Sequence, residues 1–329
     1  MEILILNADE VKASMAMEEA VAATKEAMAI YAANKALVPL RSNLDAAMGQ
    51  ALFMPGLAEA ADALGVKIVS VYPDNPARNL PAVAATMVLL DTETGMVKGL
   101  MDGTELTRMR TGALSGAATD LLARKDAKVF LLIGTGGQAM RQLEAVLAVR
   151  GIETAYIFNR KQEKAEAFVA SAKDELASYG ATLVPVSDLD PVIGEADIIT
   201  TVTTAKSPVF DGKKVKPGCH INGVGAYTPD MIELAPEIVV RADKIFVDTV
   251  DGVLNEAGDI MKPIKDGLVT REKIANEIGD VILEKLPGRE RDDEITLFKT
   301  TGSAVYDVVV AEKIFHLAEE KGIGRTVEM

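Results

Sequence analysis

A glycine-rich turn in the middle of the chain has the residue types and spacing that hold a pyrophosphate. It reads Gly134-Thr135-Gly136-Gly137-Gln138-Ala139 and directly follows an apolar run over 128–133. Gly134 permits a tight turn, Gly136 lets the backbone approach the phosphates, and Ala139 is small enough for a helix to pack closely on the strand. A helix that begins here directs its free amides and positive dipole end toward the anion. The turn therefore predicts dinucleotide binding, with contacts from Gly134, Gly136, Gly137, Gln138 and Ala139.

The strand predicted after this turn, 154–158, is followed by Asn159 and Arg160. In an NAD site of this type, an Asp or Glu at this point binds the free ribose 2′-hydroxyl. A carboxylate would repel a 2′-phosphate, whereas an amide and a guanidinium can bind one. Asn159 and Arg160 therefore favour NADP(H), and NAD(H) is the alternative. A solvated arginine at a helix start is the other interpretation of Arg160.

Composition and charge exclude several classes of function. The chain has 329 residues, of which 49% are hydrophobic and 26% charged, as in globular proteins, and it has no apolar run of membrane-spanning length. The net charge is -14, whereas a protein that binds nucleic acid needs a positively charged surface. One cysteine, Cys219, cannot form an internal disulfide, and His220 and His316 are too few for a histidine-based zinc centre. We expect a cytoplasmic protein without a metal, a nucleic-acid partner or a membrane partner.

The elements that must position these residues follow two patterns. Residues 1–7 lack the features of a signal peptide and predict a short strand, and a helix over 14–33 and antiparallel strands complete the first third. From residue 128 onward strands and helices alternate, which indicates a parallel doubly wound sheet. The other strands are expected at 51–55, 65–71, 85–90, 96–101, 128–133, 154–158, 182–186, 197–202, 220–224 and 244–247, and the other helices at 106–123, 137–150, 162–176 and 303–321. The predicted fold class is α/β, a Rossmann sheet plus a smaller α+β domain.

The order and spacing of several short motifs resemble the ornithine cyclodeaminase/mu-crystallin family over nearly the whole chain. The motifs are Pro39-Leu40-Arg41, Gly65-Val66-Lys67, Leu106 to Ala113, Gly134 to Ala139, Ile221 to Gly225, Glu277 to Asp280 and Glu294 to Lys299. The resemblance, closest to its ketimine reductase-like branch, implies a homodimer. It also implies that residues 1–113 and 305–329 form a dimerisation and substrate-binding domain, and residues 114–304 the dinucleotide-binding domain.

In this family two arginines and a lysine hold the substrate carboxylate against the nicotinamide, and the matching residues are Arg41, Lys67 and Arg110. The planar fork of arginine suits a carboxylate, and a desolvated lysine releases its proton more easily, which suits proton transfer to an imine or amine nitrogen. For each of the three, a surface salt bridge is the alternative interpretation. Further cofactor contacts are expected from Thr111, Thr201, Val202 and Val224, and further substrate contacts from Met54, Tyr227 and Gly302.

One position departs from the family pattern. Ornithine cyclodeaminases carry an aspartate just after the Val-Gly of the strand before the active-site loop, and that position is Tyr227 here. Asp230 follows in a Pro229-Asp230 pair that is similar to one in ketimine reductase-like members. Asp230 is therefore a candidate catalytic residue, and a turn or helix N-cap is its equally favoured alternative.

These residues together favour reduction of a cyclic imino acid, 1-pyrroline-2-carboxylate or a similar ketimine, by NAD(P)H. Ornithine cyclodeamination to proline and ammonia is the first alternative, and Tyr227 argues against it. Reductive amination, as in the family's alanine dehydrogenases, is a second alternative. A crystallin-like protein that binds cofactor without turnover is a third. The substrate partner in each catalytic reading is a small amino or imino acid that bears a carboxylate.

Overall fold

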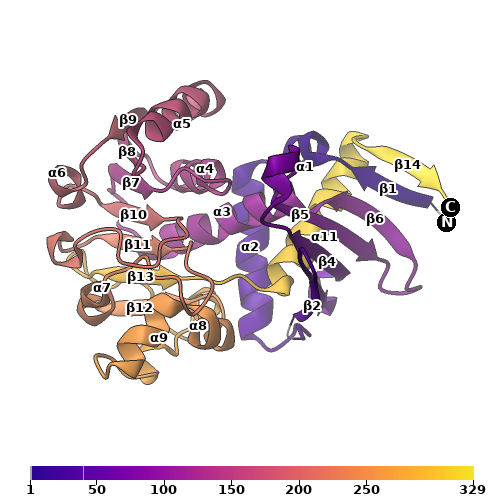
Figure 1. Ribbon diagram of the computed structural model, residues 1–329. Helices are drawn as coiled ribbons and strands as arrows, with labels where there is room; N and C mark the ends of the chain where they lie inside the picture. The colour runs from indigo at the N-terminus through magenta and orange to yellow at the C-terminus, as the bar shows by residue number, and fades with distance from the viewer. Residues whose placement is uncertain (1, 40) are drawn as a thin grey trace. The chain divides into compact units, whose positions relative to one another are not determined.

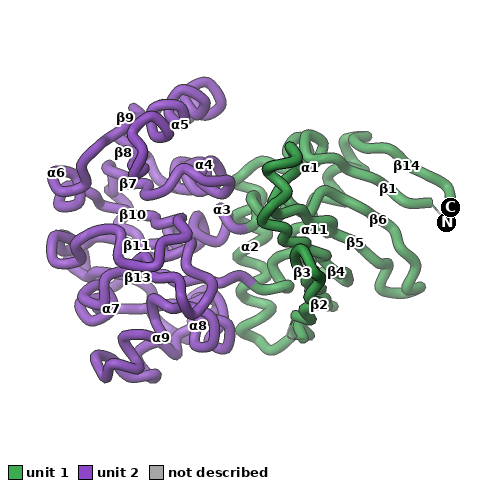
Figure 2. Tube along the Cα trace, in the orientation of Figure 1, with its two compact units in different colours: residues 1–110, 303–329 green, residues 111–302 purple. Residues whose placement is uncertain are grey.

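The computed structural model describes residues 2–39 and 41–329, so Met1 of the predicted first strand and Leu40 of the motif before Arg41 lie outside the described residues. The chain divides into two compact units (Figure 2). Unit 1 comprises residues 1–110 and 303–329, and unit 2 comprises residues 111–302. The sequence predicts boundaries after residues 113 and 304, and these units divide after residues 110 and 302. Helix α3 (Gly103–Leu122) carries the chain from the first unit into the second.

Unit 2 is built on a seven-stranded sheet in the order β12-β13-β11-β10-β7-β8-β9 (Figure 1). All of its strand pairs are parallel, which confirms the predicted Rossmann fold. Strand β13 was not among the predicted strands. The strands are β7 (Val129–Ile133), β8 (Thr154–Phe158), β9 (Thr182–Val186), β10 (Ile198–Thr201), β11 (His220–Gly223), β12 (Lys244–Val247) and β13 (Thr296–Lys299).

Both faces of this sheet are covered, as the apolar character of β7 requires. Phe130 and Leu132 point into one hydrophobic cluster with Leu143 of α4, and the alternating Leu131 and Ile133 point into a second cluster. The helices of unit 2 are α4 (Ala139–Val149), α5 (Gln162–Glu175), α6 (Asp190–Ile193), α7 (Pro236–Arg241), α8 (Val250–Glu256), α9 (Gly258–Lys265) and α10 (Ile278–Ile282), with short 3-10 turns η3 (Ala177–Tyr179), η4 (Gly212–Lys214) and η5 (Glu272–Ile274).

Strand β7 lies at the topological switch point of the sheet. Its neighbours are β8 on one side and β10 on the other. The chain continues from β7 to β8 and from β10 to β11, so these two connections run in opposite directions along the sheet. In open parallel sheets, ligands bind in the crevice at the carboxyl ends of the strands at such a point. The glycine-rich turn after β7 and the residues that follow β10 and β11 are therefore at the edge of the sheet where a dinucleotide is expected.

Unit 1 has a second seven-stranded sheet, ordered β14-β1-β6-β5-β4-β3-β2 (Figure 1). Strands β2 to β6 form an antiparallel meander, and the predicted hairpin between β5 and β6 is present. The expectation of purely antiparallel strands was wrong for β1, which pairs in parallel with β6 because helices and the meander provide the crossover between them. The strands are β1 (Glu2–Leu6), β2 (Ser42–Ala46), β3 (Gly49–Ala58), β4 (Ala63–Val71), β5 (Val83–Leu90), β6 (Val97–Asp102) and β14 (Arg325–Glu328).

The helices of unit 1 are α1 (Ala8–Ser14), α2 (Met17–Ala32) and α11 (Ala304–Lys321), with 3-10 turns η1 (Glu59–Ala61) and η2 (Asn75–Arg78). The single helix expected at 14–33 is preceded by α1, because Asn7 and Glu10 form a reciprocal capping box. Helix α11 packs against α2 and against β3, β4 and β5. None of the described helices is long and apolar enough to cross a membrane.

Candidate functional site

Lys67 lies in the middle of β4 with apolar neighbours on both sides. The strand registers place Met54 of β3 and Met87 of β5 directly beside it on the same face, and Met101 of β6 continues the row. The lysine is 2% exposed and Met87 is fully buried. A buried ammonium is costly unless a counter-charge is present. The alternative of a surface salt bridge for Lys67 is therefore wrong, and its partner must also be buried.

That partner is Asp307, in the first turn of α11. Its Oδ2 lies 2.7 Å from the Nζ of Lys67, and its Oδ1 accepts a hydrogen bond of 2.8 Å from the Nε of Arg110. Asp307 has no exposed surface. An acidic residue in a first helical turn interacts favourably with the positive end of the helix dipole. Strand β4, α3 and α11 thus bring two of the three expected substrate-binding cations onto one carboxylate.

Arg110 is held through only one edge of its guanidinium. Its Nε is used by Asp307, and within the described residues the two terminal nitrogens have no protein partner. The side chain is nearly buried, at 8% exposure. A guanidinium fixed through Nε presents its terminal N–H groups in a defined direction, which suits bidentate capture of a carboxylate. A surface salt bridge, the alternative for Arg110, does not fit this burial.

Arg41 is half-buried just before β2, and its charge interacts with that of Lys67. Its positive charge lowers the pKa of Lys67, as does that of Arg110. Burial is the largest cause of this lowering, and Asp307 opposes it by raising the pKa. The net effect brings the pKa of Lys67 from 10.5 down to about 8. A lysine with this pKa exchanges its proton readily near neutral pH, which is a requirement for general acid–base catalysis.

The glycine-rich turn in unit 2 has the backbone geometry expected of a phosphate loop. Gly134 has a φ of +109°, and a Cβ there would lie 2.7 Å from the carbonyl oxygen of Val202, so only glycine fits. Gly136 faces open space, which leaves its backbone accessible to a ligand. Helix α4 begins at the buried Ala139, with Gln138 at its N-cap position. Together with Gly137 these residues form a strand–turn–helix unit suited to a pyrophosphate.

Asn159 links the end of β8 to this turn. Its Nδ2 donates to the hydroxyl of Thr135 at 2.7 Å, and its Oδ1 accepts from the backbone amide of Lys161. Arg160 is exposed. The side chains that follow β8 are thus an amide fixed beside the glycine-rich turn and a guanidinium open to solvent. Neither would repel a phosphate.

The remaining expected cofactor contacts lie around the same end of the sheet. Thr201 ends β10, and Val202 and Val224 follow β10 and β11; all three are buried. Thr111 is the first residue of unit 2, and its carbonyl accepts a 2.9 Å hydrogen bond from the Nε2 of Gln142 in α4.

The residues expected to complete the substrate site from unit 2 have different surroundings. Tyr227 is 47% exposed. Asp230 is exposed in a turn, where it accepts from the hydroxyl of Thr228 and pairs with Lys206 at 2.7 Å. These contacts keep the pKa of Asp230 below its ordinary value. Gly302 ends unit 2, and its amide donates to the carboxylate of Asp248. The surroundings of Asp230 agree with the turn interpretation, and a catalytic role for it stays a prediction.

Sequence reasoning missed Asp307. The residue lies 197 positions from Arg110 in the chain, so spacing cannot reveal their contact. A signal was nevertheless present: Asp307 interrupts an apolar stretch of α11 in which Val305, Tyr306 and Val308 are all fully buried. An acidic residue in such a stretch requires a buried cation as partner.

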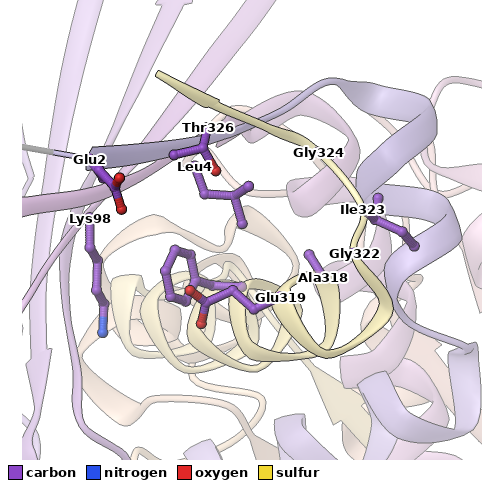
Figure 3. Close-up of a pocket in the computed structure, with 10 residues that line it drawn as sticks. Glu2, Leu4, Lys98, Ala318, Glu319, Gly322, Ile323, Gly324 and Thr326 are labelled. Atoms are coloured by element: carbon purple, nitrogen blue, oxygen red, sulfur yellow. The ribbon is translucent and has the colours of Figure 1, made fainter. Parts of the chain in front are cut away.

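A separate pocket lies elsewhere in unit 1 and contains none of the expected site residues. It has a volume of about 460 Å³ and lies where the end of α11 meets β1 and β14 (Figure 3). Phe315, Leu4 and Ile323 contribute apolar surface, and Lys98 and Glu319 contribute charge. Among the described residues, no group of three or more His, Cys, Asp or Glu side chains is arranged to hold a metal ion.

One family of known proteins matches nearly the whole chain. The model of the ornithine cyclodeaminase/mu-crystallin family matches residues 1–322. The chain belongs to the ornithine cyclodeaminase/mu-crystallin family. This confirms the resemblance inferred from the motifs around Arg41, Lys67 and Arg110.

Three members of the family are similar to the chain over its whole length. A Delta(1)-pyrroline-2-carboxylate reductase of Bacillus cereus is 39% identical and aligns over 99% of this chain and 100% of its own. The Delta(1)-pyrroline-2-carboxylate reductase of Thermococcus litoralis, solved with NADH and L-proline, is 38% identical, with a TM-score of 0.92 and coverage of 99% and 100%. An archaeal alanine dehydrogenase dimer with bound NAD is 36% identical, with a TM-score of 0.89 and complete coverage of both chains.

Proposed function

We propose that this protein reduces a cyclic imino acid, 1-pyrroline-2-carboxylate or a similar ketimine, to the corresponding amino acid with a nicotinamide dinucleotide. The observation that carries the proposal is the buried cluster in which Asp307 holds Lys67 and Arg110. Two carboxylate-binding arginines beside a lysine of lowered pKa match a substrate that carries a carboxylate next to a C=N bond. The full-length likeness to two Delta(1)-pyrroline-2-carboxylate reductases supports the same reaction.

In this mechanism the residues of unit 1 bind and polarise the substrate. The terminal nitrogens of Arg110, together with Arg41, bind the carboxylate. Lys67 donates a proton to the imine nitrogen, which makes the imine carbon more electrophilic. The reduced nicotinamide, when bound, supplies the hydride that this carbon accepts. Lys67 is left as a neutral amine and regains its proton from solvent. Asp307 keeps both cations in place and offsets their mutual repulsion throughout.

The cofactor is held by unit 2 in this proposal. The turn from Gly134 to Ala139 binds the pyrophosphate, and Thr111, Thr201, Val202 and Val224 complete the contacts. We further propose a preference for NADP(H) over NAD(H), supported by Asn159 and Arg160 after β8. The test is the ratio of KM values for NADPH and NADH in wild type and Arg160→Gln. Loss of a phosphate contact should raise the KM for NADPH about tenfold and leave that for NADH unchanged. Lys164→Gln, an exposed lysine on α5, is the control, and equal KM values for the two cofactors in wild type would contradict the preference.

Unit 1 is also proposed to form the dimer. Lys67 faces α11, so its strand neighbours Val66 and Ile68 point to the opposite face of the sheet. These apolar side chains, with Phe53 and Val88 on the flanking strands, are only half-buried in the chain itself. A continuous apolar sheet face of this kind is typical of a protein–protein interface. Ile68→Asp should therefore convert a dimer to a monomer in size-exclusion chromatography with light scattering. Val83→Asp is the control and should not do so, because Val83 is exposed at the start of β5 and pairs with Val71, which places it on the Lys67 face of the sheet.

Three alternatives remain distinguishable by one assay. Reductive amination, as in an alanine dehydrogenase, is favoured by the archaeal relative and requires the same carboxylate-binding residues. Ornithine cyclodeamination requires an acid at the position of Tyr227. A cofactor-binding protein without turnover would not require the Lys67–Asp307–Arg110 cluster. The experiment follows NADPH and NADH absorbance with 1-pyrroline-2-carboxylate, with pyruvate plus ammonia, and product formation from ornithine with catalytic NAD⁺.

The expected result is consumption of reduced cofactor with the cyclic imine at a kcat/KM at least about tenfold above that with pyruvate plus ammonia. Proline formed from ornithine, or cofactor binding without turnover of any substrate, would overturn the proposal. Lys67→Met should abolish the reaction because it removes the proton donor. Lys98→Met is the matched control, because Lys98 also projects from a strand of this sheet and pairs with an acid of α11, Glu312, at 2.6 Å.

A further inference from the structure

A second buried carboxylate, Glu233, lies in unit 2 and joins the backbone segments that follow two neighbouring strands. It has no exposed surface. One oxygen, Oε1, accepts from the backbone amide of Thr203, which follows β10. The other, Oε2, accepts from the amide of Ala226, which follows β11, at 3.0 Å and from the hydroxyl of Thr201 at 3.2 Å. A single side chain thus fixes the carboxyl ends of β10 and β11 to each other.

The two segments approach so closely that no side chain fits between them. A Cβ on Gly225 would overlap the backbone of Thr203 and would lie 2.6 Å from Oε2 of Glu233. The same segment after β10 also contacts the glycine-rich turn, because Gly134 packs against the carbonyl of Val202. A displacement of either segment would therefore reach the surface where the dinucleotide is expected.

Glu233 is itself held rigidly by a buried ion pair. Its backbone amide donates to Oδ1 of Asp259 at 2.6 Å, and Oδ2 of Asp259 lies 3.0 Å from the Nζ of Lys299. Asp259 and Lys299 are 1% and 0% exposed. Lys299 belongs to β13, which pairs with β11. The position of Glu233 is therefore also linked, through Asp259 and Lys299, to a third strand of the same sheet. The ends of β10, β11 and β13 are joined in one buried network.

We propose that Glu233 is a positioning residue that sets the nicotinamide end of the cofactor site. The proposal rests on the proposed function, in which unit 2 binds the dinucleotide. In a Rossmann sheet the ribose next to the adenine lies beyond the second strand, here β8, and the other mononucleotide half lies across the switch point, over β10 and β11. The segments that Glu233 joins are those that would contact the nicotinamide ring and fix its distance from the substrate.

Glu233→Gln is the primary test. The substitution keeps the shape of the side chain, but an amide nitrogen cannot accept, so the amide of Thr203 or of Ala226 loses its partner. Misplacement of the ring should lower kcat about 30-fold, because hydride transfer depends steeply on distance and orientation. The Kd for NADPH or NADH should change less than about threefold, because the adenine half and the pyrophosphate keep their contacts. The fluorescence lifetime of the bound reduced nicotinamide should also shift, and this measurement needs no substrate.

Asp197→Asn is the matched control. Asp197 is also a nearly buried carboxylate of unit 2 that accepts from two backbone amides, those of Lys128 and Val129, but it does so at the opposite, amino-terminal ends of β7 and β10. It should lose thermal stability with kcat and nicotinamide lifetime unchanged. Gly225→Ala is a second variant, which keeps the Glu233 carboxylate but forces the two segments and Oε2 of Glu233 apart, and it should reproduce the loss of kcat.

The outcomes separate the two proposals. If Glu233→Gln is destabilised like the control but keeps the kcat and the nicotinamide lifetime of wild type, Glu233 is only structural and the inference is overturned. If wild type binds NADPH or NADH but reduces no imino acid, the proposed substrate is wrong, while the lifetime comparison still decides the role of Glu233. Should Glu233→Gln fail to fold, an unchanged lifetime in Gly225→Ala would overturn the inference.

Discussion

Lys67 and Asp307 form a buried ion pair of 2.7 Å that joins the central strand β4 to the first turn of α11. The same carboxylate fixes Arg110 through its Nε, so one acidic residue determines the position of two cations. Without it, three positive groups, including Arg41, would repel one another in a buried region.

Asp307→Asn should lower kcat/KM for the imine about 100-fold and the free energy of unfolding by about 3 kcal/mol. The substitution leaves Lys67 and Arg110 without a counter-charge, and breaking one side of a buried pair is costly. Steady-state kinetics and urea unfolding measure the two effects. Glu312→Gln is the control, because Glu312 lies on the same helix and pairs with Lys98. It should keep kcat/KM within about twofold, and an equal loss of activity in both variants would contradict a specific role for Asp307.

The rate of imine reduction should fall as the pH rises through about 8, the pKa of Lys67. Burial lowers this pKa, so the ammonium loses its proton in a range where an ordinary lysine keeps it, and only the protonated form can donate to the imine nitrogen. Removal of Asp307 should move this limb to lower pH, because Asp307 raises the pKa. The measurement is the pH profile of kcat/KM.

Lys67→Arg provides the decisive comparison for this profile. A guanidinium stays charged throughout the accessible range, so the alkaline limb should disappear whatever activity remains. Lys98→Met should keep the wild-type profile. A limb that persists near pH 8 in Lys67→Arg would assign it to another group.

Stability at acid pH should depend on His220. This side chain is fully buried, with its ring nitrogens 2.9 Å from the hydroxyl of Thr296 and 3.0 Å from the Oδ1 of Asn222. Burial lowers its pKa from 6.5 to about 3, with a further contribution from Arg289. The unfolded chain therefore takes up a proton below pH 6.5 that the folded chain resists until about pH 3. The contribution of neutral His220 to the free energy of unfolding is therefore fully present above pH 6.5. It decreases as the pH falls, by about 2 kcal/mol at pH 5.

The comparison is between wild type and His220→Gln in urea unfolding at pH 7.5 and pH 5. From pH 7.5 to pH 5, the free energy of unfolding should fall by about 2 kcal/mol less in the variant than in wild type. His316→Gln is the control, because His316 has a half-exposed side chain on α11. A variant at 220 with the same pH dependence as wild type would exclude this explanation.

Several parts of the molecule followed directly from the sequence. The turn from Gly134 to Ala139 and the unbroken apolar run of β7 predicted the Rossmann unit, because buried parallel strands and phosphate loops have local signatures. Strand β2 was missed because all of its residues are exposed and its sequence shows no alternation. The parallel pairing of β1 with β6 depends on a long crossover and leaves no local pattern.

The candidate site was predictable only in part, for the same reason. Arg41, Lys67 and Arg110 were found through family motifs. Asp307, which holds two of them, is distant in sequence and was recognisable only as an acid within an apolar helix. Glu233 was missed although it contacts the predicted cofactor residue Thr201, because its role depends on backbone amides that sequence does not display.

Met54 provides a prediction on substrate size. It lies directly beside Lys67 in the strand register and is half-buried, so its side chain has room to contact a substrate bound at the lysine. An apolar, flexible neighbour suits the methylene groups of a small ring. Met54→Ala should enlarge this space and raise the ratio of kcat/KM for a six-membered over a five-membered cyclic imine carboxylate about fivefold, since one methylene in an apolar pocket discriminates by about tenfold or more. Met96→Ala, an exposed residue in the loop between β5 and β6, is the control. An unchanged ratio in Met54→Ala would place the ring of the substrate away from β3.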